Sequence, residues 1–182
     1  MSDADPEKVD PEEEAFRQAC QRVGEFLYHF ALLEREMDEG IAKLLELPGG
    51  VVDIVTANMD FFRKLKVLFS AEFAKAAIPG EARKKMLQQT WDAISSLNDH
   101  RIMMAHYPFS PAKPSGVVFR KAVAVKQLKV ENVECSDDKF KEAIGKLTTT
   151  RETLHKLIDE MIPYTPKLDF SDPRNSMYIC LL

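Results

Sequence analysis

The stretch that decides the fold is Gly24-Glu-Phe-Leu-Tyr-His-Phe-Ala-Leu-Leu-Glu34-Arg-Glu-Met37, in which apolar side chains recur at steps of three and four residues. This spacing places them on one face of an α-helix. The repeat continues in both directions and predicts a helix over residues 11–47. Asp10-Pro11 is typical of a helix start, and Pro48-Gly49-Gly50 is typical of a helix end. A helix of this length favours a bundle.

Three further helices are predicted from apolar repeats of the same kind, over residues 52–77, 81–107 and 137–162. A segment without helical period lies before the last of them. Its first part, 109–116, is rich in proline and is predicted as a loop, and its valine-rich part, 117–130, predicts one or two short strands. The predicted fold is therefore all-α: an antiparallel four-helix bundle with a short β-hairpin or extended insert, about 109–134, before the last helix.

The two ends of the chain differ from this predicted bundle, which covers residues 11–162. Residues 1–10 are acidic and poor in apolar groups, and we expect them to be disordered. Residues 163–182 form a C-terminal tail with the apolar end Met177-Tyr-Ile-Cys-Leu-Leu182. We expect this end to dock on the body of the protein, or otherwise to contact a partner.

Composition and charge exclude several classes of protein. The chain has 182 residues, a net charge of −4 and 45% hydrophobic residues, which is the composition of one globular domain and not of a sequence-independent DNA-binding protein. Its three cysteines show no metal-ligand spacing, and no apolar run approaches the ~20 residues of a membrane span. We expect reduced thiols, no membrane partner and a cytoplasmic location.

A segment at the end of the third long helix carries the candidate chemistry: Asn98-Asp-His-Arg-Ile-Met-Met-Ala-His106. Arg101 presents a planar charged fork that matches a phosphate, and His106 can take up a proton near neutral pH. Such a pair suits attack of an RNA 2′-hydroxyl on its own phosphodiester. On a regular helix the two side chains point about 140° apart, so they meet only if the helix end unwinds before Pro108 or if two copies of the chain pack together. Alternatively, His106 interacts only with the last carbonyls of its helix.

Three helices each place a charge on an otherwise apolar face, at Glu34, Arg101 and Arg151. Because an unpaired buried charge is costly, we expect Glu34 to meet one of the two arginines. The pair would either fix the helix register or orient a working Arg101, and the spacing leaves both possibilities open. Arg63, Lys64 and Lys66 form a short basic cluster. We expect these three side chains to lie on a solvent-exposed face of their helix.

The histidines do not form a metal-binding pattern. There is no HExxH motif, and Glu-x-x-His occurs once, at Glu152-Thr-Leu-His155, whereas a metal site in a bundle takes such a pair from each of two helices. A phosphate-binding loop and a nucleophile elbow are also missing. The sequence therefore predicts neither a metal site nor a cofactor.

The Arg101-Ile-Met-Met-Ala-His106 segment is an Arg-x4-His motif at the end of a long helix, and an aromatic-Pro-aromatic turn follows it. This resembles the signature of HEPN domains (higher eukaryotes and prokaryotes nucleotide-binding). The stretch around Glu34 is similar to the opening helix of bacterial HEPN-like proteins. The likeness covers roughly residues 12–162.

The resemblance implies a homodimer that packs through its third long helices. It further implies a metal-independent ribonuclease site, or a site that binds RNA or a nucleotide, and a role as a toxin with a cognate antitoxin or in phage defence. Arg101 would hold the scissile phosphate and His106 would be the acid or base. Active members usually carry Asn, Asp or His directly after the arginine. Here that position is Ile102, and the supporting polar candidates are Asn98, His100 and Glu34.

A second function class remains open on the same residues. The chain is then a non-catalytic homodimeric interaction module, in which Glu34, Arg101 and Arg151 form a structural network. The two hypotheses differ in what happens when Arg101 is removed. Loss of a structural charge lowers stability, whereas loss of a working charge lowers activity.

Overall fold

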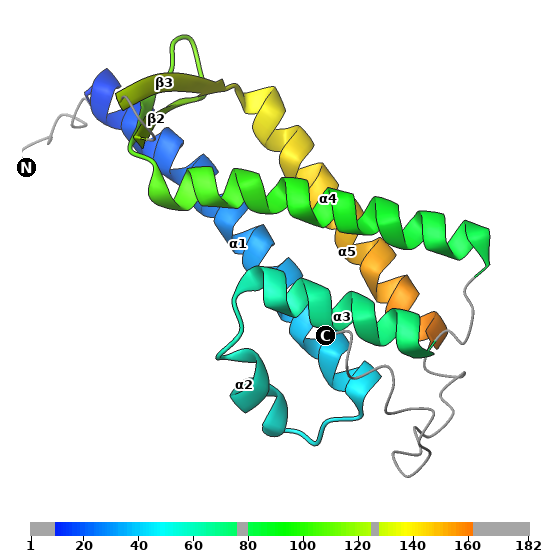
Figure 1. Ribbon diagram of the computed structural model, residues 1–182. Helices are drawn as coiled ribbons and strands as arrows, with labels where there is room; N and C mark the ends of the chain where they lie inside the picture. The colour runs from blue at the N-terminus through cyan, green and yellow to red at the C-terminus, as the bar shows by residue number, and fades with distance from the viewer. Residues whose placement is uncertain (1–9, 76–79, 125–127, 162–182) are drawn as a thin grey trace, which may run out of the picture. The chain divides into compact units, whose positions relative to one another are not determined.

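The structure, a computed structural model, describes residues 10–75, 80–124 and 128–161. Over these residues it is mostly helical, with a small antiparallel sheet before the last helix (Figure 1). The elements in chain order are α1 (Pro11–Leu45), α2 (Val51–Thr56), α3 (Phe61–Lys75), α4 (Glu81–His106), β1 (Phe109–Pro111), β2 (Val117–Ala124), β3 (Leu128–Cys135) and α5 (Asp137–Met161). The predictions for an acidic N-terminal tail and for a docked apolar C-terminal tail fall outside the described residues.

The chain divides into two compact units. Unit 1 comprises residues 1–30 and 96–147, and unit 2 comprises residues 31–95 and 148–182. Unit 1 therefore holds the sheet, the first part of α1, the end of α4 and the start of α5. Unit 2 holds α2, α3 and the remaining parts of the three long helices.

Unit 1 is built around aromatic and aliphatic side chains on the inner face of its sheet. The strand order is β1-β2-β3, with Phe109 opposite Phe119 and Val117 opposite Cys135. Strand alternation turns Val117 and Phe119 into the core, where both are fully buried. Figure 1 shows the sheet over the N-terminal part of α1, and stacking of Phe16 on Phe109, with ring centroids 6.2 Å apart, agrees with this placement.

A glycine fixes the turn that leads into β2. Gly116 has φ +109°, and a Cβ atom there would lie 2.5 Å from the backbone oxygen of Cys135. A side chain at this position would meet rigid backbone in a conformation that L-residues rarely adopt. The turn therefore requires glycine.

The core of unit 2 consists of helix faces at the usual three- and four-residue spacing. Its fully buried aliphatic side chains include Leu33, Met37, Ile41, Leu44, Leu65, Leu68, Leu87, Ile94 and Leu154. Gly40 permits a close approach, because a Cβ atom there would overlap the side chains of Ile158 and Leu68. Most of the helix positions that the apolar repeats predict are buried, but Phe16, Leu45 and Phe62 are exposed.

Two helix starts follow the sequence prediction. The N–H of Glu12 donates to Oδ1 of Asp10 at 3.0 Å, which confirms Asp10 as the cap of α1. The N–H of Lys139 donates to Oγ of Ser136 at 3.4 Å, which confirms Ser136 as the cap of α5. Local capping groups were therefore readable from the sequence alone.

Two element predictions were wrong. The helix predicted over 52–77 is split into α2 and α3, because Asp60 ends the connection by capping α3: its Oδ1 accepts from the N–H of Arg63 at 2.9 Å. The loop predicted over 109–116 contains β1, which pairs with β2. The insert is thus a three-stranded sheet and not a single hairpin.

Candidate functional site

Helix α4 stays regular to its end. The N–H of Tyr107 still donates to the carbonyl of Met103, at 3.0 Å, and Pro108 then lacks an N–H to continue the ladder. The carbonyl of Pro108 accepts from the N–H of Arg120 in β2 at 2.9 Å, so the chain passes directly from α4 into the sheet. Unwinding of the helix end at Pro108, one of the two ways in which Arg101 and His106 could meet, does not occur. Arg101 and His106 therefore keep the separation of about 140° that a regular helix imposes.

Arg101 lies on the apolar face of α4, near the buried side chains of Leu97 and Met104. It is half-buried, yet it forms no hydrogen bond or ion pair with any other residue that the structure describes. None of its nitrogens is sealed from solvent. Its position on the apolar face was predicted, but the expected carboxylate partner is not there. The charge is therefore available to a ligand.

Asn98 precedes Arg101 by three residues and shares its side of α4. It is only 3% exposed, but neither atom of its side-chain amide is sealed from solvent. Within the described part of the chain its amide has no hydrogen-bond partner. An amide N–H₂ beside a guanidinium supplies several donors at one point on the helix. Such a pair suits an oxyanion.

The two histidines of the segment differ in environment. His106 is exposed at the last position of α4 and contacts no described side chain by hydrogen bond. His100 is half-buried, with Nδ1 2.8 Å from the carbonyl oxygen of Ser96 and its ring 6.4 Å from that of Phe26. Because a carbonyl only accepts, Nδ1 of His100 carries the proton and Nε2 of the neutral ring is left as the acceptor. Neither ring is hydrogen-bonded to a side chain among the described residues.

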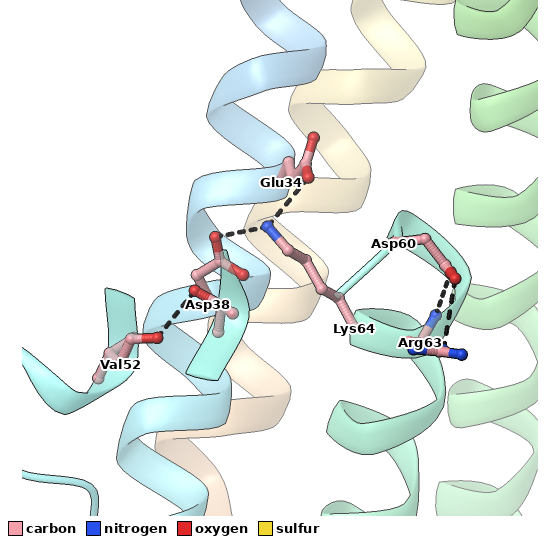
Figure 2. Close-up of polar contacts among 7 residues, drawn as sticks. Glu34, Asp38, Val52, Asp60, Arg63 and Lys64 are labelled. Carbon is pink, nitrogen blue, oxygen red and sulfur yellow. Dashed lines mark hydrogen bonds and ion pairs between the residues drawn. The ribbon is translucent and has the colours of Figure 1, made fainter. Parts of the chain in front are cut away.

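In unit 2, Glu34 meets a lysine and not an arginine. Nζ of Lys64 donates to Oε1 of Glu34 at 3.0 Å and to Oδ2 of Asp38 at 2.9 Å (Figure 2). Glu34 and Asp38 lie one turn apart on α1, and Figure 2 shows the Lys64 side chain reaching toward both from α3. The predicted pairing of Glu34 with an arginine was wrong. The charge of Glu34 is used to hold α3 against α1.

Lys64 is buried, with its side chain 9% exposed, so its predicted solvated position was wrong. Burial acts to lower the pKa of this lysine, but the hydrogen bonds that it donates to Asp38 and Glu34 outweigh burial, and the pKa is raised above 10.5. Lys64 is therefore a permanent cation near neutral pH. This excludes it as a neutral nucleophile and favours a structural role.

Arg151 also finds its partner within unit 2. Its Nε and Nη2 donate to Oε1 of Glu36 at 3.1 and 2.6 Å. Neither Glu36 nor Asp38 was singled out from the sequence, although Asp38 follows Glu34 by one helical turn and so carries a usable signal. Of the three charges predicted on apolar faces, two are paired with an opposite charge and Arg101 is not.

No protein-family model, curated protein or solved structure matches the chain. The described residues contain no group of three or more His, Cys, Asp or Glu that could hold a metal ion. Nor does any helix among them have the length and apolar character needed to cross a membrane. The residues at the end of α4 therefore carry the evidence on function.

Proposed function

We propose that the chain binds and cleaves single-stranded RNA without a metal ion, as a homodimer that packs through the end of α4. The observation that carries the proposal is the half-buried guanidinium of Arg101 beside the amide of Asn98, neither of which has a partner within residues 10–75, 80–124 and 128–161. A cation kept on an apolar face without a carboxylate is unfavourable unless a ligand supplies the opposite charge. A phosphodiester supplies that charge in the geometry that the guanidinium fork fits.

The homodimer follows from the angle between Arg101 and His106. One regular helix cannot direct both side chains at one phosphate, so the histidine beside Arg101 comes from a second copy. Ile102 and Met103 lie one turn before His106 on the same side of α4 and are only half-buried. These apolar side chains offer a surface against which a second α4 can pack. The antiparallel four-helix bundle belongs to the same proposal.

The chemistry is an internal transfer. The 2′-oxygen forms a bond to phosphorus as His106 takes its proton, and the bond from phosphorus to the 5′-oxygen breaks. His100, in the form that carries a proton on Nε2, donates the proton that the leaving oxygen needs and ends as the neutral ring. Arg101 and Asn98 hold the charge that accumulates on the phosphoryl oxygens. The products are a 2′,3′-cyclic phosphate and a free 5′-hydroxyl.

The resemblance in the Arg-x4-His segment supports a biological setting for this activity. We propose a cytoplasmic toxin, in a toxin–antitoxin or phage-defence system, whose ribonuclease is held inactive by a cognate antitoxin protein. An antitoxin that covers the end of α4 would block both RNA entry and contact between two copies.

The test is RNA cleavage in EDTA by the wild type, Arg101→Ala and His106→Ala. Arg17→Ala and His155→Ala are matched controls, because both residues are exposed and lie outside the segment. Mixing the two inactive variants distinguishes a shared site from a site within one chain. If each site takes Arg101 from one copy and His106 from the other, half of the sites in a mixed dimer are intact and cleavage returns. Absence of cleavage in the wild type, or equal cleavage in all variants, contradicts the proposal.

The paired charges of unit 2 favour a second candidate, a non-catalytic homodimeric interaction module. Lys64 with Glu34 and Asp38, and Arg151 with Glu36, form the kind of buried charge network that this candidate requires. Ile102, at a position that is polar in active HEPN-like nucleases, points the same way. A dimer in analytical ultracentrifugation that binds no RNA would support this candidate against the nuclease.

A further inference from the structure

A shallow cavity of about 240 Å³ lies on the outer face of the sheet in unit 1, beside the turn that follows α4. Its lining residues are Pro108, Phe109, Ser110, Val118, Arg120 and Asn132. Pro108 is the second residue after His106. The cavity therefore adjoins the chain segment that carries the proposed site.

The strand register explains why polar groups gather there. Arg120 in β2 is directly opposite Asn132 in β3, so their side chains share one face of the sheet. Val117 and Phe119 point into the core, so this shared face is the outer one. The hydrogen bond from the Arg120 N–H to the Pro108 carbonyl ties the end of α4 to the same strand.

Neither polar side chain is committed elsewhere. Arg120 and Asn132 are exposed, and in the described ranges their side chains have no hydrogen bond or ion pair. Glu134 carries a carboxylate on the same face but does not line the cavity. Phe109 is paired with Phe119, so its ring lies on the inner face, where it packs between Phe16 and Phe119 at centroid distances of 6.2 and 5.8 Å and fixes the position of β1 beside the cavity. The apolar side chain on the same face as Arg120 is Val118. An apolar surface with free donors beside it is a common form of ligand site.

We propose that this cavity is a subsite for one unpaired nucleotide of the RNA that binds at Arg101 and His106. The guanidinium of Arg120 pairs with its phosphate, the Asn132 amide bonds the edge of its base, and Val118 supplies the apolar contact. The assignment rests on the proposed function, since the RNA must pass the end of α4 to reach the sheet. The proposal predicts that RNA binds to the outer face of the sheet as well as to the end of α4.

The experiment measures binding of a fluorescent single-stranded 2′-O-methyl RNA, about ten nucleotides long, by anisotropy in EDTA. This probe lacks the attacking hydroxyl, so binding is separated from cleavage. We expect Arg120→Ala to weaken binding about tenfold and to lower the salt slope by about 0.7, the contribution of one phosphate contact. Asn132→Ala should weaken binding severalfold with an unchanged slope. Lys129→Ala is the matched control, because it removes an equal exposed charge from the opposite face of the sheet.

The outcomes separate this inference from the proposed nuclease. Binding by Arg120→Ala that equals binding by Lys129→Ala overturns the subsite, and so does a wild type that does not bind the probe. If Arg120→Ala binds weakly while Arg101→Ala and His106→Ala leave cleavage unchanged or no protein cleaves, the subsite stands and the nuclease fails. Circular dichroism of each variant verifies that the exposed substitution has left the fold intact.

Discussion

Lys64 in unit 2 and Arg101 in unit 1 are both cations among apolar side chains of a helix, and they differ in what surrounds their charge. Nζ of Lys64 is within 3.0 Å of two carboxylates, whereas Arg101 has no carboxylate or carbonyl partner among the described residues. For Lys64, the two carboxylates of the protein offset the free-energy cost of burying a charge. For Arg101, that cost would have to be offset by a bound anion. The contrast supports a stabilising role for Lys64 and agrees with the ligand-binding role proposed for Arg101.

The largest expected effect is on the rate of RNA cleavage, which should depend strongly on Arg101 and weakly on Lys64. Arg101→Ala should lower RNA cleavage at least about 100-fold, because the scissile phosphate loses its charge clamp. Lys64→Met should change cleavage much less, since its charge is directed at Glu34 and Asp38. The measurement is the initial rate of cleavage of a labelled RNA in EDTA at a temperature where both variants are folded.

Arg101→Lys refines this result. It keeps the charge but loses the planar fork, so we expect a rate between those of the wild type and Arg101→Ala. A rate for Arg101→Lys equal to that of the wild type would show that only net charge matters. Full activity of Arg101→Ala would break the comparison outright.

The second effect is on the free energy of unfolding. Here substitution of Lys64 should have the larger effect and substitution of Arg101 the smaller one. Lys64→Met should lower the free energy of unfolding by about 2–3 kcal/mol, because two carboxylates lose their shared cation. The loss is below that of a fully buried pair, since the side chains of Glu34 and Asp38 are still 32% and 24% exposed. Arg101→Met should cost less than about 0.5 kcal/mol or raise stability, as removal of a functional charge often does.

Urea unfolding followed by circular dichroism measures both variants. Lys66→Met is the matched control for Lys64→Met, because it removes the same charge from an exposed position two residues further along α3. A larger loss of stability for Arg101→Met than for Lys64→Met would favour the interaction module over the nuclease.

How much of this contrast the sequence could predict depends on the range of each interaction. The caps at Asp10 and Ser136 were predictable because the acceptor and its N–H lie within three residues. The position of Arg101 on an apolar face followed from helical period. The partner of Lys64 did not, because its carboxylates lie a whole helix earlier and the neighbouring Arg63 and Lys66 suggest a solvated face.

The break between α2 and α3 and the short β1 were missed for a related reason. Apolar positions continue through 57–60 with little loss of period, and only the Asp60 cap marks the new start. Strand β1 has three residues, including a proline, and exists because β2 pairs with it. Such a strand has no periodic signal of its own.

The third effect concerns the other paired charge of unit 2. Arg151 and Glu36 should couple by about 1–2 kcal/mol, the range for hydrogen bonds between charged groups that are mostly shielded from water. A double-mutant cycle with Glu36→Gln and Arg151→Met measures this coupling directly. A coupling energy near zero would mean that Glu36 does not stabilise Arg151. Lys64 would then be the one cation of this comparison that a carboxylate of the protein stabilises.

The smallest effect is a pH dependence of the Lys64 contribution. The pKa of Lys64 is raised above 10.5 in the folded protein, so folding retains a proton that the unfolded chain releases first. The stability that Lys64 supplies is thus complete below about pH 10.5 and is lost as the pH rises through its folded value. The difference in unfolding free energy between wild type and Lys64→Met should be constant from about pH 6 to about pH 9 and shrink above that.

The difference in unfolding free energy between wild type and Lys64→Met also cancels a second effect of alkaline pH on stability. Burial raises the pKa of the Cys135 thiol above 9.0, so both proteins lose stability when their unfolded chains ionise there. That loss is common to the wild type and to Lys64→Met and cancels. Arg101→Met, compared with wild type in the same way, should show a flat difference, because it removes a cation that has no ion pair among the described residues. A difference for Lys64→Met that shrinks on the acid side instead would mean that its carboxylates, and not the lysine, carry the linkage.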